Sequence, residues 1–158
     1  MPLRTQIYKT LQTMPGSSFW VKKTITSSGI TTSAQSLTTA ATGQLYVKQV
    51  IVKTDSTGLA GGTNFTILSS NANGVVNILV ETVANLGANV TKVLSGVATA
   101  GDTTTSDGTP TVTSLNTILE AGKKLQYLNT SAVGTGAGTI DVFVEFVRID
   151  NNASCKAA

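Results

Sequence analysis

The sequence predicts an all-β protein, an antiparallel β-sandwich of about eight strands with an extended N-terminal arm. β-Branched residues dominate from residue 19 onward, turn-forming Gly, Asn and Asp recur between these runs, and no stretch has the periodicity of a long helix. Short strands separated by turns fit two packed sheets better than strands alternating with helices. We expect the β-sandwich domain at residues 19–150, an N-terminal arm at 1–18 and a C-terminal tail at 151–158.

The first 18 residues form the predicted arm. Pro2 and Pro15-Gly16 enclose the segment "LRTQIYKTLQT", whose apolar spacing is too weak for a helix. Apolar and basic side chains without such periodicity are typical of a segment that becomes ordered on a partner. The candidate partner-binding residues of the arm are Arg4, Ile7, Tyr8, Lys9 and Leu11.

The first β-rich run, "SFWVKKTITS", contains the neighbouring aromatic residues Phe19 and Trp20. Aromatic residues make up only 5% of the chain, so this pair stands out. Because aromatic side chains commonly pack in cores, we predict that both fill one end of the sandwich. Contact with a sugar or a protein partner is the alternative.

Residues 44–55, "QLYVKQVIVKTD", are predicted to form a strand with one apolar and one mixed face. Strict alternation divides its side chains into two sets, Leu45, Val47, Gln49 and Ile51 against Tyr46, Lys48, Val50 and Val52. The segment "STGLAGG" then ends the strand.

Residues 63–70 and 75–84 are predicted to form a β-hairpin around Asn73-Gly74. An Asn-Gly pair between β-rich runs indicates a tight turn, because both central turn positions require a positive φ. A short helix over 75–86 is the alternative. Its valines and isoleucine are stiff at χ1, which favours the strand.

Residues 87–114 are rich in Gly, Thr, Ser and Asp, and predict a loop region with short strand pieces. Gly122 then separates two further β-rich runs. The segment "GTGAG" at 134–138 predicts a closing hairpin in which 124–132 and 139–149 pair as antiparallel strands. The last strand carries Ile140, Val142, Val144 and Phe146 on one face and Asp141 and Glu145 on the other.

Charged residues are only 12% of the chain, about half the share of an ordinary soluble domain. Such a surface can pack against neighbours without the desolvation cost of many buried ions. The net charge of +3 arises from 11 basic and 8 acidic residues without a dense basic stripe, so we expect no nucleic-acid binding. No run is long and apolar enough for a membrane span or a secretion signal, and we expect synthesis in a reducing cytoplasm.

The residue types argue against an enzyme. The chain has no histidine, so Ser-His-Asp and Cys-His machinery cannot be built. Two carboxylate pairs could in principle serve a glycosidase, Asp141 with Glu145 and Asp102 with Asp107, but we interpret them as solvated surface polarity. We predict no catalytic residue, no cofactor and no metal site.

Three further features are not interpreted as binding or reactive sites. "GTGAG" is followed by a strand and not by the helix that a dinucleotide-binding loop requires. "DTTTSDG" at 102–108 lacks the terminal glutamate of a calcium loop. Cys155, the one cysteine, is expected to be an exposed thiol near the end of the chain.

Residues 118–150, "ILEAGKKLQYLNTSAVGTGAGTIDVFVEFVRID", resemble the last two strands of capsid decoration (cement) proteins of tailed bacteriophages with a jelly-roll-like β-sandwich. In that family an "aG-x-x-L" step enters one strand, and a glycine-rich turn leads to a closing strand of β-branched and aromatic residues. "YVKQVIVKTDSTG" at 46–58 resembles an early strand of the same sandwiches. The first 18 residues and the loop at 96–114 have no counterpart in the family.

The resemblance implies a non-enzymatic virion structural protein without a cofactor. Such a protein forms a homotrimer, binds the major capsid protein on the capsid exterior and stabilises the DNA-filled head. A carbohydrate-binding or adhesin-like module of a phage tail or fibre is the alternative, because sandwiches host that function often. Several aromatic side chains on one exposed face would favour this alternative.

Overall fold

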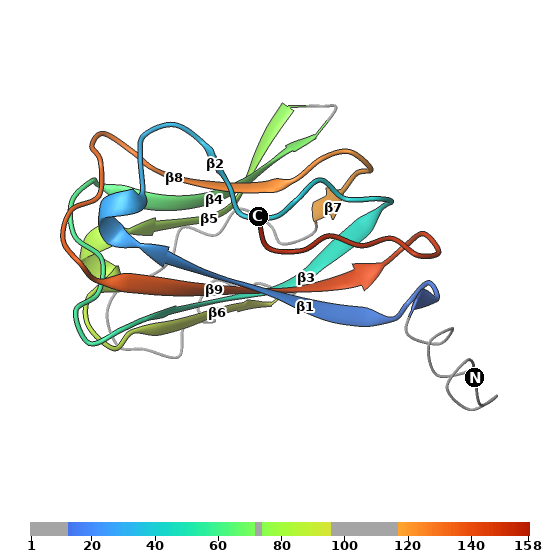
Figure 1. Cartoon of the computed structure of the whole chain (residues 1–158), viewed down its shortest axis with the longest axis horizontal. Coiled ribbons are helices and arrows are strands. Elements are labelled where there is room, and N and C mark those ends of the chain that lie inside the picture. The colour runs from blue at the N-terminus through green and yellow to red at the C-terminus, as the bar shows by residue number, and fades with distance from the viewer. Residues whose placement is uncertain (1–12, 72–73, 96–116) are drawn as a thin grey trace.

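The structure is a computed structural model, and it describes residues 13–71, 74–95 and 117–158. In this part of the chain, nine strands form two antiparallel sheets that pack face to face (Figure 1). Sheet 1 has the order β1-β9-β3-β6, with β7 beside β3; its strands are β1 (Ser18–Thr26), β9 (Thr139–Arg148), β3 (Leu45–Thr54), β6 (Thr91–Ser95) and β7 (Thr117–Leu119). Sheet 2 has the order β2-β8-β4-β5; its strands are β2 (Gln35–Ser36), β8 (Leu125–Asn129), β4 (Asn64–Asn71) and β5 (Gly74–Thr82). The predicted all-β antiparallel sandwich is confirmed.

The path of the chain is that of a double-sheet jelly roll. The chain moves from one sheet to the other at β1–β2, β2–β3, β3–β4, β5–β6, β7–β8 and β8–β9. Within the described residues, β4 and β5 are the strands that are consecutive in sequence and hydrogen-bonded to each other. Two short 3-10 turns, η1 (Ser27–Gly29) and η2 (Val83–Leu86), follow β1 and β5. Strands that neighbour each other in a sheet are therefore mostly distant in sequence.

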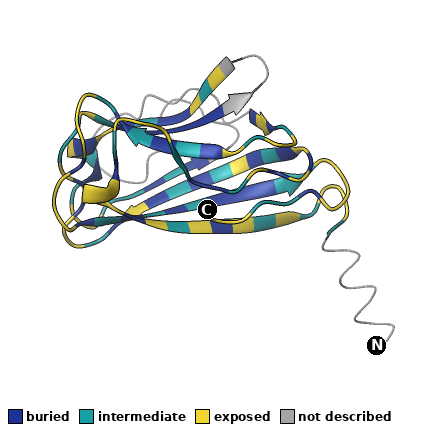
Figure 2. Ribbon diagram, turned by 45° about the horizontal axis from the view of Figure 1, so that its top comes forward, coloured by how far each residue is buried: buried dark blue, intermediate teal, exposed yellow. Residues whose placement is uncertain are grey.

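The core lies between the inner faces of the two sheets. In β9, Ile140, Val142, Val144 and Phe146 are all buried, as the alternation predicted. Sheet 2 contributes Phe65, Ile67, Ile78 and Leu79 from β4 and β5, with Leu125 and Tyr127 from β8. Figure 2 shows the same alternation along the strands, where buried residues are interspersed with less buried ones. Burial of these apolar side chains is the main force that holds the sheets together.

The strand predicted at 44–55 forms as β3, but strict alternation along it was wrong. The register of β3 against β9 shifts between Val47 and Gln49, which is a β-bulge. The inward-facing residues before the bulge are Leu45 and Val47, and those after it are Val50 and Val52. A bulge inserts one extra residue, so every later side chain changes face.

The hairpin predicted around Asn73-Gly74 is confirmed as β4–β5, and the alternative helix over 75–86 did not form in β5. The predicted turn position was wrong by one residue. Gly74 pairs with Asn71 and is the first residue of β5. The two residues between them, 72 and 73, lie outside the described part of the chain.

The predicted closing hairpin of β8 and β9 was also wrong. β8 pairs with β2 and β4 in sheet 2, whereas β9 pairs with β1 and β3 in sheet 1. The glycine segment 134–138 therefore carries the chain across the end of the sandwich. Its backbone packs directly on the η1 segment, since Gly134 N donates to the Ile30 carbonyl at 2.8 Å and the Gly138 carbonyl accepts from Ser27 N at 2.7 Å. A Cβ at Gly134 or Gly138 would overlap backbone atoms, so glycine is required for close approach.

Asp55 connects the end of β3 to the start of β9. Its Oδ1 accepts hydrogen bonds from Thr57 N at 2.9 Å and Gly58 N at 2.8 Å, and its Oδ2 accepts from the amide and hydroxyl of Thr139, both at 2.9 Å. The backbone N–H groups of Gly58 and Thr57, together with Thr139, hold the pKa of Asp55 below its ordinary value despite some desolvation.

We expect Asp55→Asn to lower the free energy of unfolding at pH 7. The difference in this free energy between the wild type and the variant should become smaller at acidic pH. Because the folded pKa lies below the unfolded one, the stability that ionised Asp55 contributes is present above about pH 4 and is lost as the pH falls through the folded value. Urea unfolding of the wild type and the variant at pH 7 and at about pH 3 measures the difference in their free energies of unfolding at each pH. A difference that is equal at the two pH values would contradict this assignment.

The last residues of the chain run along the segment between β2 and β3. Thr39 N donates to the Lys156 carbonyl at 2.8 Å, and Thr42 N donates to the Ser154 carbonyl at 2.9 Å. Cys155 is half-buried against the core, so the expected exposed thiol was wrong. Burial raises the pKa of this thiol to about 12. It is therefore almost entirely protonated near neutral pH and a poor nucleophile.

Candidate functional site

The five candidate residues of the arm, Arg4, Ile7, Tyr8, Lys9 and Leu11, lie outside the described residues, and their role stays a prediction. The described chain begins at the point where the arm meets the sandwich. There the Thr13 carbonyl accepts a hydrogen bond from Asn152 N at 2.9 Å, and Gly16 N donates to the Arg148 carbonyl at 2.8 Å. These two hydrogen bonds attach residues 13–16 to the end of β9 and to the turn that follows it.

The outer face of sheet 1, defined here by Trp20, Lys22, Ile51, Val93 and Phe143, is the candidate interaction surface. The register places Lys22, Phe143, Ile51 and Val93 in one row across all four main strands. Lys22 Nζ lies 5.3 Å from the centroid of the Phe143 ring, a cation–π contact. Apolar side chains therefore follow one another across the solvent side of the sheet, where alternation alone would place polar residues.

Phe19 and Trp20 take opposite sides of β1, because successive strand residues point to opposite faces. Phe19 stacks on Phe146 with ring centroids 5.5 Å apart, and the Arg148 guanidinium lies 4.3 Å from the Phe19 ring centroid. The prediction that both aromatics fill the end of the sandwich was right for Phe19 and wrong for Trp20. Trp20 is 48% exposed on the outer face of sheet 1.

The two carboxylates considered for a glycosidase are each held by a lysine. Lys22 Nζ lies 2.8 Å from Asp141 Oδ2, and Lys48 Nζ lies 3.0 Å from Glu145 Oε1. Partial burial disfavours ionised Asp141, but hydrogen bonds from Lys22 and Thr24 outweigh it and lower the pKa of that carboxyl.

This arrangement keeps Asp141 ionised, whereas a general acid needs a raised pKa. The two carboxylates are thus not simply solvated, as expected from the sequence, but paired. Asp102 and Asp107, the other candidate pair, lie outside the described residues, as does the possible calcium loop at 102–108.

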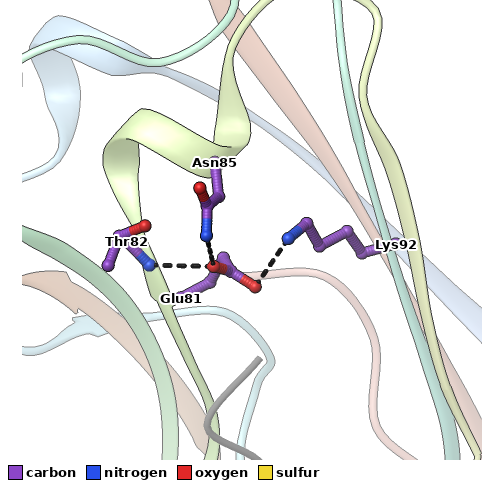
Figure 3. Close-up of polar contacts among 4 residues, drawn as sticks. All are labelled: Glu81, Thr82, Asn85 and Lys92. Carbon is purple, nitrogen blue, oxygen red and sulfur yellow. Dashed lines mark hydrogen bonds and ion pairs between the residues drawn. The ribbon is translucent and has the colours of Figure 1, made fainter. Parts of the chain in front are cut away.

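A second polar cluster lies inside the sandwich and was not predicted. Glu81 of β5 and Lys92 of β6 form an ion pair at 2.9 Å, and each side chain is only 1% exposed (Figure 3). The second oxygen of Glu81 accepts hydrogen bonds from Asn85 Nδ2 at 2.9 Å and from Thr82 N at 3.1 Å. This buried cluster, Glu81, Asn85 and Lys92, connects the edge strand of sheet 2 to the edge strand of sheet 1.

Lys23 makes a corresponding connection at the opposite edge. Lys23 and Lys92 stand at the two ends of one inner row of sheet 1, with Val142 and Val52 between them. Lys23 Nζ donates to the Ser36 carbonyl of β2 at 2.9 Å and to the Ala158 carbonyl at 2.7 Å. Inward-pointing lysines at both edges protect a sandwich against edge-to-edge pairing with other chains.

Within residues 13–71, 74–95 and 117–158, no group of three or more His, Cys, Asp or Glu side chains is placed to hold a metal ion. The same described part contains no helix that is long and apolar enough to cross a membrane. Three lysine–carboxylate ion pairs lie in this part of the chain, two on the outer face of sheet 1 and one buried between the sheets.

The chain has remote similarities to viral proteins. No protein-family model and no curated protein matches it. A chain of the Cyanophage Pam1 capsid asymmetric unit is similar over 85% of this chain and 86% of that one, with 21% sequence identity and a TM-score of 0.41. The SPBc2 prophage-derived protein YomS is similar over 80% and 95%, with 12% identity and a TM-score of 0.32. A chain of infectious bursal disease virus, Gx strain, is similar over 86% and 38%, with 10% identity and a TM-score of 0.23. These values do not assign the chain to a family.

Proposed function

We propose that this chain is a non-enzymatic virion structural protein, a capsid decoration protein that binds the outside of the major capsid lattice and stabilises the DNA-filled head. The protein would act as a homotrimer, with the arm of residues 1–18 contacting major capsid subunits and the outer face of sheet 1 lying between copies. Stabilisation would come from added buried area at the joints between capsid subunits and not from chemistry.

The outer face of sheet 1 is the observation that carries this proposal. A row of apolar side chains with an exposed tryptophan is unusual on the solvent side of a sheet, and such patches mark interaction surfaces. Trp20 is the kind of residue that dominates the energetics of protein interfaces. The nearby carboxylates Asp141 and Glu145 are already neutralised within the chain, so burial of the face would leave fewer unpaired charges. The class of partner comes from the resemblance of residues 118–150 to decoration proteins.

Several arms on one trimer would bind several capsid subunits at once. Linked binding events raise the overall affinity far above that of each arm, provided that the geometry permits simultaneous contact. Each arm would contribute modestly, because ordering a segment on a partner costs about 2–5 kcal/mol of the interaction energy. Trimerisation and capsid binding are thus coupled in this proposal.

Deletion of residues 1–12 is expected to leave the sandwich folded and to weaken particle binding by about 100-fold or more, because avidity is lost. The deletion ends before Thr13, whose carbonyl is hydrogen-bonded to Asn152, so the described contacts remain. Circular dichroism checks the fold, and co-sedimentation with particles lacking this protein measures binding. The particles used are those of the phage that encodes the chain.

A full-length chain carrying Ile7→Ser, Tyr8→Ser and Leu11→Ser is the control. It keeps the length of the arm and removes its apolar side chains, so it shows whether lost contacts or lost length weaken the binding. Unchanged binding of the truncated protein would contradict the arm's role.

Trp20→Ser is expected to weaken the free energy of association by about 2 kcal/mol or more at each subunit interface, as for an aromatic residue at the centre of an interface. The equilibrium should therefore shift from trimer toward monomer. Val75→Ser is the matched control, because Val75 is even more exposed, at 66%, but stands on β5 of sheet 2. Light scattering over a concentration series measures the oligomeric state. A wild-type protein that stays monomeric in solution and on particles would contradict the trimer. A trimer that survives Trp20→Ser would place the contact elsewhere on the sandwich.

A carbohydrate-binding or adhesin-like module remains the alternative, favoured by one observation, the exposed ring of Trp20. Stacking on sugars by such modules typically uses several aromatic faces. Among the described residues, Trp20 is the aromatic side chain with more than a third of its surface exposed. A glycan screen that shows binding by the wild type but not by Trp20→Ser would favour this alternative.

A further inference from the structure

In the buried cluster an amine and a carboxamide each contact the same carboxylate. Lys92 Nζ lies 2.9 Å from one oxygen of Glu81, and Asn85 Nδ2 lies 2.9 Å from the other. Figure 3 shows that the three side chains come from β5, η2 and β6 and meet at the Glu81 carboxylate. The amine of Lys92 and the carboxamide of Asn85 are therefore held at the two oxygens of one carboxylate.

Two buried apolar side chains lie beside the ion pair of the cluster. Glu81 stands opposite Phe65 in sheet 2, and Lys92 stands opposite Val52 in sheet 1; both of these neighbours are fully buried. Asn85 is half-buried in η2 and is thus the member of the cluster nearest to solvent. The side chains of Glu81 and Lys92 are thus shielded from solvent, whereas Asn85 is partly accessible.

We propose that Lys92 and Asn85 react with each other in the folded protein to form an intramolecular isopeptide bond, with Glu81 as the group that carries the proton. Lys92 first transfers a proton to Glu81 and becomes a neutral amine. Its Nζ then attacks Cγ of Asn85, a new Nζ–Cγ bond forms, and the Cγ–Nδ2 bond breaks.

The protons and electrons balance within the three residues and the leaving group. Protonated Glu81 donates its proton to Nδ2 of Asn85 and accepts one from Lys92 Nζ, so it is unchanged at the end of these exchanges. Asn85 loses Nδ2 as neutral ammonia, which leaves through the half-exposed side of η2, and the one remaining proton stays on Glu81. No oxidant, reductant or metal ion is required. Glu81 is the catalytic residue, because it contacts both reacting nitrogens.

The residue types and their setting suit this reaction. A lysine amine becomes a nucleophile when it is desolvated in an apolar pocket. The Lys92 amine and the Asn85 carboxamide are both held by the Glu81 carboxylate, so they do not have to meet by diffusion. This arrangement greatly increases the rate of an otherwise slow acyl transfer. The product would convert a buried ion pair into a neutral amide and a neutral carboxylic acid. It would also join β6 of sheet 1 covalently to η2, which follows β5 of sheet 2.

The mass of the intact full-length protein is the first test. We expect the purified wild type to be lighter than its sequence by one ammonia. After denaturation and trypsin treatment, an unmodified chain is cleaved after Lys53, Lys92 and Lys123 and yields peptides 54–92 and 93–123. Trypsin does not cleave after an acylated lysine, so the linked protein should yield a single peptide 54–123. A full mass together with complete cleavage after Lys92 overturns the proposal.

Variants assign the bond to the three residues. Asn85→Ala and Lys92→Met should each show the full mass for their sequence, and Glu81→Gln, which keeps the shape of the side chain, should lose the linkage while retaining a β-type circular dichroism spectrum. A blocked cleavage site after Lys92 in Asn85→Ala overturns the proposed partner, and persistence of the bond in Glu81→Gln overturns the role of Glu81.

A cyclic imide at Asn73-Gly74 would also release one ammonia, so the mass alone is not sufficient. That product leaves Lys92 open to trypsin and does not depend on Glu81. Loss of ammonia with normal cleavage after Lys92 therefore counts against the isopeptide bond. These measurements are made on the isolated protein and do not involve particles or the oligomeric state, so they are independent of the proposed capsid role.

Discussion

Replacement of Gly138 by alanine is expected to lower the free energy of unfolding by about 3 kcal/mol, the upper part of the usual range for overpacking, or to prevent folding. The added Cβ would lie far inside van der Waals distance of the Gly58 carbonyl oxygen. Both groups are backbone, and neither can rotate aside as a side chain could. The Gly138 carbonyl also accepts the hydrogen bond from Ser27 N at 2.7 Å, so a shift of this loop would disturb the connection after β1.

Gly29→Ala is the matched control for this prediction. Gly29 lies in η1 at the same end of the sandwich, no atom would lie within 4 Å of an added Cβ, and its φ is not positive. We expect a change of no more than about 0.5 kcal/mol, as for an ordinary surface substitution. Urea unfolding of the wild type and both variants measures the difference. Equal stabilities for the two variants would show that the loops can separate at little cost.

Most strands could be predicted from local sequence, because their β-branched residues and turn signals lie within each segment. β3, the β4–β5 hairpin and the alternation of β9 all follow from such local patterns. The pairing of β9 could not be predicted in this way. Its partners are β1 and β3, which lie far away in sequence, and a glycine-rich segment looks the same whether it turns a hairpin or crosses between sheets.

The bulge in β3 shows a second limit of local patterns. Lys48 and Gln49 are two consecutive polar residues in an otherwise alternating run, and this interruption is the available signal. The position of the bulge is decided by packing against β9, where Val47 and Val50 both have to reach the core. A pattern of period two has no means of indicating such a change of face.

The candidate surfaces were predicted only in part. The composition indicates a surface with few charged side chains. The positions of Trp20 on the outer face of sheet 1 and of Phe19 against the core, however, depend on the register of β1 with β9. The buried cluster was not predicted, because lysine and glutamate normally occupy solvent-exposed positions. Lys92 stands two residues before the buried Leu94 in β6, so alternation from that leucine would have placed the lysine inside.

Measured against wild-type protein that still has its full mass, and so keeps the ion pair of Lys92 with Glu81, replacement of Lys92 by methionine is expected to destabilise the protein by about 3–5 kcal/mol, the usual cost of removing one partner of a buried ion pair. Methionine has a similar length and fits the space, so the loss is not mainly one of packing. What remains is Glu81, whose carboxylate is 1% exposed and retains hydrogen bonds only from Asn85 and Thr82 on one oxygen. A second substitution, Glu81→Leu, removes the unpaired carboxylate and should recover most of the lost stability.

Lys22→Met is the surface control for the same kind of contact. Lys22 and Asp141 lie 2.8 Å apart, closer than the buried pair, but their side chains are 51% and 27% exposed. Water screens this pair, and its removal is expected to cost no more than about 1 kcal/mol. Thermal or urea unfolding of the two single variants and the Glu81→Leu/Lys92→Met double variant at pH 7 provides the comparison. If Lys92→Met costs no more than Lys22→Met, the buried ion pair does not stabilise the protein, and the edge strands β5 and β6 are held together by the apolar core alone.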